Sequence, residues 1–198
     1  PANPVLDDFN RADGSLGANW YGSTGSYSIV NQQAQVVASG DLQWTASAFS
    51  ANQEVFVTLT SINPASTEIN LRLKTQLNYA MIEVLYQPAA SAAAVWTYAP
   101  EQGWVQRGAA IPISLTAGDQ FGARALADGT VAVYHNGGLL AARAVSAWPY
   151  NLLGGYLGVS MLNASGTRLE DFGGGDVTAA LPAVHTYSVS ASADDVNE

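Results

Sequence analysis

Apolar and polar residues alternate most regularly in the segment from Glu68 to Thr75. Every second position is apolar and the positions between are polar: Ile69, Leu71 and Leu73 against Asn70, Arg72 and Lys74. Side chains of a β-strand point alternately to the two faces of a sheet, so this pattern predicts one buried and one solvated face. Glu54 to Ile62 alternates in the same way. Tyr79 to Tyr86 is apolar in both registers apart from Glu83, which predicts a strand through the centre of a sheet.

Two turn signals divide the stretch from Gly118 to Arg143 into three apolar segments. Asp128-Gly129 and Asn136-Gly137 tolerate the positive φ values that two-residue hairpin loops require. The segments that flank these turns are too short for helices. The stretch therefore predicts three consecutive antiparallel strands and an all-β protein.

Further short apolar segments complete the pattern, and none has the period of a three-turn helix. The other expected strands are Leu6–Phe9, Tyr27–Val30, Gln35–Ala38, Leu42–Phe49, Trp104–Gln106, Ile113–Leu115, Tyr156–Leu162 and Thr167–Phe172. The alanine-rich residues 88–100 are bracketed by Pro88 and Pro100 and predict a loop that leads into a strand at Val95 to Tyr98. Many short strands of this kind are typical of an antiparallel β-sandwich.

The length of 198 residues suits one domain with a sizeable core. Composition changes after Asp176, where Ala, Ser and Val predominate and the last seven residues include three carboxylates. We predict one domain over residues 1–177 and an extended acidic arm over residues 178–198. The arm is either a linker or a segment that docks on a neighbouring molecule.

The charge balance is acidic, with 16 acidic residues, seven basic ones and a net charge of −9. Nucleic-acid and anionic-membrane surfaces need clustered Lys and Arg, so the composition argues against both partners. The absence of cysteine excludes disulfides and thiolate metal sites. The longest uncharged stretch, from Ala144 to Thr167, is broken by Pro149 and several glycines and does not suit membrane insertion.

The N-terminus begins Pro-Ala-Asn-Pro and lacks the basic and apolar regions of a signal peptide. Either a signal was removed, or the chain began Met-Pro and lost only its initiator methionine, as for a virion component made in a cytoplasm. We expect the protein outside the cell or on the surface of a particle.

Residues 7–20, Asp-Asp-Phe-Asn-Arg-Ala-Asp-Gly-Ser-Leu-Gly-Ala-Asn-Trp, resemble the opening of bacterial and phage proteins of the concanavalin A-like superfamily, in its laminin G-like branch. Later motifs follow in that family's order: Leu71-Arg72-Leu73, Asn78-Tyr79, Gly118-Asp119, Asn136-Gly137, Gly154-Gly155-Tyr156-Leu157-Gly158 and Leu169-Glu170-Asp171-Phe172. The resemblance covers roughly residues 5–177. It implies a jelly-roll β-sandwich of two curved antiparallel sheets, whose first and last strands lie side by side at the Asp-Phe pairs 8–9 and 171–172.

No set of residues has the spacing of a known catalytic site. Glucanases of this fold carry Glu, Asp and Glu on alternate residues of one strand, and no strand here does so. Glu170 and Asp171 are adjacent, which predicts that they lie on opposite faces of the sheet and cannot act as a pair. There is no Gly-x-Ser-x-Gly elbow and no Cys nucleophile, and His135 and His185 lie far apart in the sequence. We predict that the protein is not an enzyme.

Calcium is the one cofactor that the sequence suggests. Five aspartates come from the two chain ends that the resemblance brings together: Asp7, Asp8, Asp13, Asp171 and Asp176. Hard oxygen ligands suit Ca²⁺, and members of the superfamily often hold an ion near these strands. The Asp-x-Asp-x-Asp-Gly spacing is absent, so the alternative is a set of isolated surface aspartates.

Aromatic residues in predicted loops and at strand ends are the candidate ligand-binding residues. Trp and Tyr rings stack on the flat C–H faces of sugars, while Asn, Gln and Asp accept hydrogen bonds from hydroxyl groups. The candidates are Trp96, Tyr98, Trp104, Trp148 and Tyr150. The alternative is that they fill the sandwich core, where we expect Trp20 and Trp44.

Two functions fit these observations. The first is a non-catalytic, lectin-like binding or adhesion module that recognises carbohydrate or a surface protein. The alternative is a structural or decoration protein of a virion, such as a phage capsid or tail, whose C-terminal arm mediates self-association or contacts capsid or tail proteins.

Overall fold

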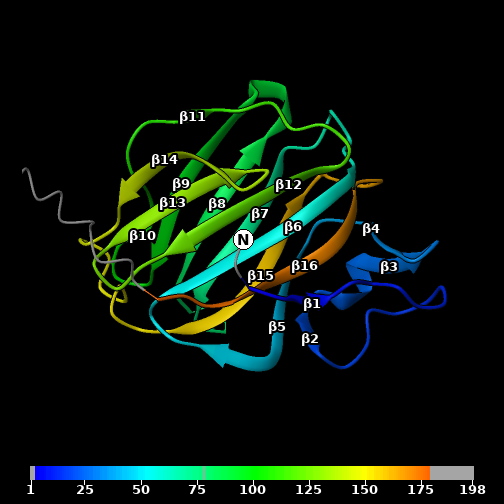
Figure 1. Ribbon diagram of the computed structural model, residues 1–198, viewed down its shortest axis with the longest axis horizontal. Coiled ribbons are helices and arrows are strands. Elements are labelled where there is room, and N and C mark those ends of the chain that lie inside the picture. Colours follow the sequence, from blue (N-terminus) through cyan, green and yellow to red (C-terminus); the bar gives the residue numbers. More distant parts are fainter. Residues whose placement is uncertain (1–2, 78, 179–198) are drawn as a thin grey trace, which may run out of the picture.

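The computed structural model describes residues 3–77 and 79–178, which form two antiparallel sheets of eight strands each. Sheet A has the strand order β14 (Gly138–Ala144), β13 (Thr130–His135), β12 (Asp119–Ala125), β6 (Gln53–Ser61), β16 (Arg168–Asp176), β4 (Gln33–Val36) and β3 (Tyr27–Val30), and β1 (Val5–Asp7) pairs with β16. Sheet B has the order β10 (Gly103–Gln106), β9 (Ala92–Ala99), β8 (Met81–Gln87), β7 (Glu68–Thr75), β15 (Gly155–Leu162), β5 (Gly40–Phe49) and β2 (Trp20–Gly22), and β11 (Ile111–Pro112) pairs with β9. Figure 1 shows the two sheets stacked as layers, so the fold is the predicted all-β jelly-roll sandwich. Two single-turn 3₁₀ helices, Thr24–Ser26 and Pro88–Ala90, lie in connections.

The first and last strands of the described chain lie side by side, as the resemblance implied, but β1 ends at Asp7, so the Asp-Phe pair 8–9 lies outside the paired residues. Asp7 of β1 lies opposite Phe172 of β16, and Val5 lies opposite Gly173. Figure 1 shows β1 beside β16. Of the predicted C-terminal arm, residues 179–198 lie outside the described residues.

Inward-facing residues of the strands fill the space between the sheets. The apolar residues predicted on the buried face of β7, Ile69, Leu71 and Leu73, are at most 1% exposed. Trp20 and Trp44 are also buried, with their rings edge to face at 5.5 Å between centroids. The alternation of apolar residues therefore predicted the core correctly.

Lys74 is buried, although the alternation predicts that it faces solvent. Its backbone φ is 49°, so β7 departs from regular strand geometry at this residue and the side chain turns inward at the end of the sandwich. Nζ donates hydrogen bonds to the carbonyl oxygens of Leu126 at 3.1 Å and Asn151 at 2.5 Å. The prediction was wrong for Lys74 because one irregular residue breaks strict alternation.

Asn70 and Arg72 point away from the core as predicted, but they are only 1% and 5% exposed. Neighbouring side chains of sheet B cover them, so this face of β7 is not a plain solvated surface. It is the floor of the hollow described below.

Two connections near β9 differ from the sequence-based prediction. β9 begins at Ala92 instead of Val95, because Ala93 and Ala94 pair with Tyr86 and Leu85 of β8 and this pairing overrides the low strand propensity of alanine. The expected strand Ile113–Leu115 is absent, and the preceding β11 pairs with β9 in its place. The three-stranded meander expected around the two Gly-containing turns is present as β12, β13 and β14.

Candidate functional site

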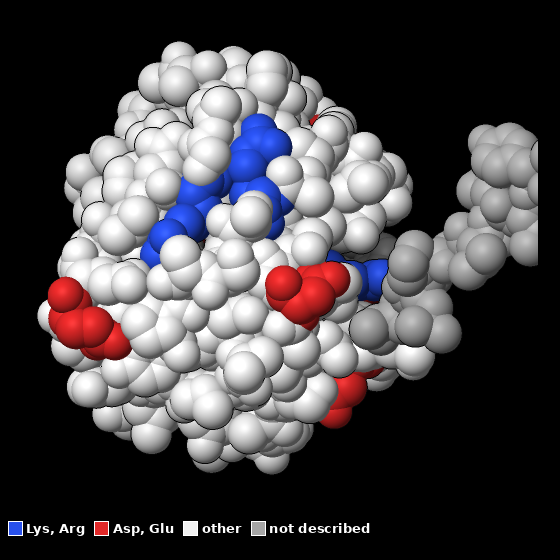
Figure 2. Space-filling model, turned by 90° about the vertical axis from the view of Figure 1, so that its left-hand side faces the viewer, with Lys and Arg blue, Asp and Glu red and all other residues white. Residues whose placement is uncertain are grey.

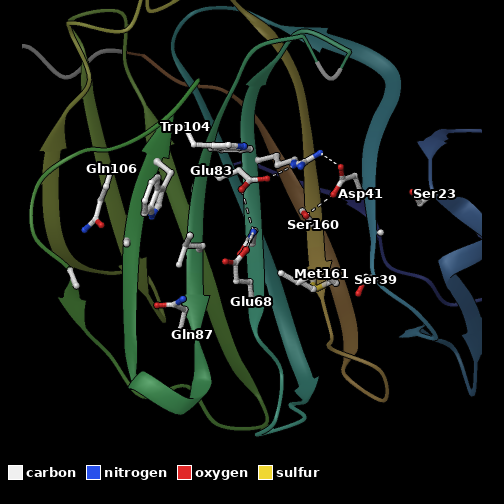
Figure 3. A pocket seen from close by; sticks show the side chains of 18 residues that line it. Ser23, Ser39, Asp41, Glu68, Glu83, Gln87, Trp104, Gln106, Ser160 and Met161 are labelled. Carbon is white, nitrogen blue, oxygen red and sulfur yellow. Dashed lines mark hydrogen bonds and ion pairs between the residues drawn. The ribbon is translucent and has the colours of Figure 1, made fainter. Parts of the chain in front are cut away.

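The outer face of sheet B carries a groove of about 610 Å³. The groove crosses six strands, from β10 through β9, β8, β7 and β15 to β5. Strands are about 4.8 Å apart, so these six span roughly 24 Å, several times the width of one sugar ring. Figure 3 shows Gln106 at one end of the groove and Ser23 and Ser39 at the other, with Trp104 drawn between Gln106 and Glu83.

The strand register aligns the groove residues in rows across the sheet. In the central row, Trp96 lies opposite Glu83, and Glu83 lies opposite Arg72. Gln106 extends this row beside Trp96 on the β10 side. Residues opposite one another share a face of the sheet, so the row combines aromatic, acidic and basic side chains on one surface.

A second row runs parallel to the first, two residues further along each strand. Leu85 lies opposite Asn70, Asn70 opposite Ser160, and Ser160 opposite Asp41. The aliphatic side chain of Leu85 lies on the Trp96 side of this row, and the polar side chains lie toward β5. The groove therefore changes from aromatic and aliphatic at one end to hydroxyl and carboxylate at the other.

Arg72 is at the centre of a polar network on the groove floor. Its Nε lies 2.6 Å from Oε1 of Glu83, and its Nη1 lies 3.0 Å from Oδ2 of Asp41. The other carboxylate oxygen of Asp41 accepts a hydrogen bond from Ser160 Oγ at 2.6 Å. Figure 3 shows Glu83, Asp41 and Ser160 joined in this way, and with Arg72 the network spans four strands, β8, β7, β15 and β5. These contacts fix the charged side chains in the absence of any ligand.

Asn70 joins a third carboxylate to this network. Its Nδ2 donates to Oε2 of Glu68 at 3.1 Å and to Oε2 of Glu83 at 3.3 Å. Burial raises the pKa of Glu83 above its usual value, Arg72 opposes this shift, and the nearby charges of Asp41 and Glu68 add to it. The three acids therefore share one groove, and the charges of Asp41 and Glu68 favour the protonated form of Glu83.

Two of the five predicted aromatic residues, Trp96 and Trp104, line the groove. Trp104 is 48% exposed, so its ring is open to a ligand. Tyr98 packs against Trp104 with the ring centroids 5.2 Å apart. Tyr98 thus supports the ring of Trp104.

The other two predicted aromatic residues lie elsewhere. Trp148 is 1% exposed, belongs to the core and donates from Nε1 to the carbonyl oxygen of Tyr98 at 2.8 Å. Tyr150 is half-buried and packs between Trp148 and the exposed Tyr79, with ring centroids 5.6 Å and 5.8 Å away. This cluster does not line the groove.

Sequence reasoning missed the polar residues of the groove: Asp41, Glu68, Asn70, Arg72, Glu83 and Ser160. One signal was present, because Glu83 is the only charged residue in a strand that is otherwise apolar in both registers. Its partner Arg72 lies on the neighbouring strand of the chain. The pairing register that aligns the two residues cannot be read from the alternation of either strand alone.

The five predicted calcium ligands are not gathered at one point. Asp7, Asp8 and Asp171 line a shallow depression on the β1 side. Asp13 accepts a hydrogen bond from the Asn31 amide, and Asp176 accepts one from the Ser50 amide. Among the described residues, no group of three or more His, Asp or Glu side chains has an arrangement that could hold a metal ion.

Asp7 is engaged by protein donors. Its carboxylate accepts from both Nη atoms of Arg11 at 2.7 and 3.0 Å, from Trp20 Nε1 at 2.7 Å and from the Phe9 amide at 2.8 Å. Burial alone would raise the pKa of Asp7, but these hydrogen bonds outweigh it and lower the pKa. The calcium site stays a prediction, and Asp7 has a structural role without it.

No known protein-family model matches the chain, and no curated protein sequence matches it. In the part of the chain that the structure describes, no helix is long and apolar enough to cross a membrane.

Solved structures do match the fold. Carbohydrate-binding module CBM66 from Bacillus subtilis is 10% identical with a TM-score of 0.61, over 81% of this chain and 98% of that chain. Galectin LEC-6 from Caenorhabditis elegans is 11% identical with a TM-score of 0.50, over 79% and 95%. Alginate lyase Aly36B, solved as a mutant with an alginate trisaccharide, is 12% identical with a TM-score of 0.57, over 90% and 99%. At these identities the similarity shows the fold alone, so the chain is a jelly-roll β-sandwich with the concanavalin A-like fold.

Proposed function

We propose that this protein is a non-catalytic carbohydrate-binding module that holds a glycan in the groove of sheet B. The observation that carries the proposal is the exposed ring of Trp104 beside a preformed network of polar side chains around Arg72. Glycan sites need this combination, because sugar rings stack on aromatic faces while their hydroxyl groups need fixed hydrogen-bonding partners.

The groove offers each kind of contact in the order that a glycan chain could use. A ring stacked on Trp104 would lie near the amide of Gln106, two residues along the same strand, and the amide of Gln87 lines the groove further along β8. Further along the groove, Asp41 and Glu68 supply carboxylate oxygens for hydroxyl donors. The network orders these groups before binding, so little side-chain entropy is lost when a glycan binds. The similar folds of a carbohydrate-binding module and a galectin support this use of the fold by analogy.

The bonding of the acids favours binding over catalysis. A glycosidase needs one carboxyl group that can release a proton to the leaving oxygen and a second that attacks or activates water. Glu83 is tied to Arg72 at 2.6 Å, and Asp41 is tied to both Arg72 and Ser160. Neither carboxylate is free to exchange a proton with a bound sugar without breaking its ion pair. The fold itself does not exclude catalysis, because an alginate lyase has a similar fold. The ion pairs of Glu83 and Asp41 are what favour a binding role.

The proposal fits a protein that meets glycans outside the cell or on a particle surface. The alternative role as a virion component depended on the N-terminal sequence, the resemblance to phage proteins and the C-terminal arm, and nearly all of this arm lies outside the described residues. That alternative stays a prediction from the sequence.

A glycan array tests the proposal directly. The wild-type protein should bind a subset of glycans, and Trp104→Ala should bind them at least about fivefold more weakly, a loss of roughly 1 kcal/mol. Tyr79→Ala is the matched control, because Tyr79 is an exposed aromatic residue that does not line the groove. Equal binding by wild type and Trp104→Ala, or no binding to any glycan, would contradict the proposal.

A further inference from the structure

The charges that line the groove restrict the chemistry of its ligand. We infer that the groove accepts neutral or amine-bearing glycans and rejects glycans that carry carboxylate or sulfate groups. This inference rests on the proposed carbohydrate-binding function and names the class of glycan.

Acidic side chains outnumber basic ones among the charged residues of the groove. Of the side chains that line it, four carry charge: Asp41, Glu68, Glu83 and Arg72. Three are carboxylates and one is a guanidinium. The remaining lining residues are neutral, so the groove has an excess of negative charge.

The guanidinium of Arg72 is not available to an acidic sugar. Arg72 is 5% exposed and lies between two carboxylates, with Glu83 at 2.6 Å and Asp41 at 3.0 Å. An anionic ligand would have to displace one of these ion pairs and leave its carboxylate uncompensated, which is costly for a buried charge. Arg72 therefore holds the floor of the groove together and is a poor anchor for anions.

The acids are the charges that a ligand can reach. The side chain of Asp41 is 43% exposed, and Glu68 is half-buried at the start of β7. Both lie on the side of the groove away from Trp96 and Trp104. A glycan that stacks on Trp104 and extends across the sheet would bring its next residues over these two carboxylates. An ammonium group there gains an ion pair, and an acidic group there is repelled.

Basic side chains are grouped outside the groove. Arg107 follows β10, and Arg143 of β14 donates from Nε to the carbonyl oxygen of Ala109 at 2.9 Å and lies beside Gly108, so the Arg143 side chain contacts the segment that directly follows Arg107. Figure 2 shows a band of basic side chains on this side of the molecule and a second, smaller basic patch beside acidic side chains. Any attraction of the protein for anions is therefore expected at this band, and a test must separate it from the groove.

The test compares glycans that share a backbone and differ in charge. Neutral cello-oligosaccharide, the corresponding glucosamine oligomer and the corresponding glucuronate oligomer are suitable probes, together with sulfated and unsulfated partners of every glycan that binds on the array. We expect each acidic group to weaken binding roughly fivefold and the amine to strengthen it by a similar factor at low salt, with both effects reduced by added salt.

Two substitutions that each replace a charged side chain by glutamine test whether the groove causes the discrimination against acidic glycans. Glu68→Gln keeps an oxygen that can accept the Asn70 hydrogen bond and removes one negative charge, so the affinity for acidic glycans should rise relative to the affinity for their neutral partners, and this ratio is the quantity to measure. Arg143→Gln is the control at the basic band and should leave this discrimination unchanged. Melting temperatures establish that both variants fold.

The outcomes separate this inference from the function on which it rests. Acidic glycans that bind as tightly as their neutral partners, and lose binding in Trp104→Ala, would overturn the inference and leave the proposed function standing. Acidic glycans that bind only through Arg107 and Arg143 would support it, because the groove itself then excludes them. Failure to bind any glycan would overturn both.

Discussion

Arg72 and Glu83 face each other across the β7–β8 pair, with Nε 2.6 Å from Oε1, and both side chains are almost fully buried although they lie on the outer face of the sheet. An ion pair in this position is enclosed by the groove residues and not by the sandwich core. Its charges are held in place by Asp41 on one side and Asn70 on the other. The stability of this strand pair and the shape of the groove floor therefore depend on the same contacts.

Removing one member of this network should destabilise the fold. Arg72→Ala leaves Glu83 and Asp41 without their cation, and the loss of one partner from a buried pair typically costs about 3–5 kcal/mol. Chemical denaturation would measure the loss. A double variant, Arg72→Met with Glu83→Leu, should lose less stability than the two single substitutions added together, because it leaves no lone charge at that position. Additive losses would contradict the coupling.

Acidification should weaken glycan binding through Glu83. Burial holds the pKa of Glu83 above the ordinary value of 4.5, so as pH falls this carboxylate takes up a proton while the protein is still folded. Protonation breaks its ion pair with Arg72 and disorders the groove floor. Binding measured against pH should fall at a pH above 4.5, and Glu83→Gln should be weaker at neutral pH and lack this transition. The other charged groups that face Glu83 are Arg72, Asp41 and Glu68, so Glu68→Gln is a control variant at a neighbouring acid, and it should keep the pH transition that Glu83→Gln lacks.

The raised pKa of Glu83 affects stability in the opposite direction: binding should weaken as pH falls, whereas stability should decrease as pH rises. A raised pKa in the folded state means that folding favours the protonated acid, so the contribution of Glu83 to stability decreases as pH rises through its folded pKa. Wild type should therefore lose stability relative to Glu83→Gln as pH rises from about 4.5 toward neutral. A difference that does not vary with pH would contradict the raised pKa.

Lys74 should make the free energy of unfolding depend on pH in the alkaline range. Burial lowers its pKa to about 8, against an ordinary value of 10.5, and Asp128 partly opposes the shift. Below about pH 8 Lys74 is protonated in both the folded and the unfolded state, and its buried charge lowers stability. Between about pH 8 and 10.5 Lys74 loses its proton in the folded state but keeps it in the unfolded state, so stability should rise with pH.

The comparison for Lys74 is the difference in unfolding free energy between wild type and Lys74→Met. That difference should shift in favour of wild type as pH rises from about 8 to about 10. The upper limit is set by Tyr27, whose burial raises its pKa above the ordinary value of 10.0 and adds a loss of stability at higher pH. A constant difference would show that Lys74 titrates normally.

The positions of Trp104 and Trp148 illustrate how far the sequence predicts the site. Both lie beside Gly or Pro in the sequence and were equal candidates, yet Trp104 is 48% exposed in the groove and Trp148 is 1% exposed in the core. The difference arises because β10 is an edge strand of sheet B, while the loop with Trp148 closes the end of the sandwich and donates its indole N–H to Tyr98. Which loop covers the core is a tertiary property that local composition does not encode.

The fold was more predictable than the site for a related reason. Apolar alternation decides which face of β7 enters the core, and turn dipeptides mark the hairpins around β13. The groove is made by residues on the opposite face of six strands, and its rows depend on register between strands that are distant in the chain, such as β15 with β7 and β5. Single-strand patterns carry no information on that register.

Asp7 tests whether the chain ends are held by calcium or by the protein's own hydrogen bonds. Its two carboxylate oxygens accept from Arg11, Trp20 and the Phe9 amide, so Asp7→Asn should remove the ion pair, disturb the buried Trp20 N–H and lower stability by about 1–3 kcal/mol. The lowered pKa of Asp7 also predicts that its contribution is present above about pH 3.8 and is lost as pH falls through its folded pKa. The loss in Asp7→Asn should be the same in excess EDTA and in millimolar calcium, because the donors to Asp7 are protein groups. If calcium raises the melting temperature of wild type and not that of Asp7→Asn, this carboxylate binds the ion, and Asp8 and Asp171 beside it are the next ligands to substitute.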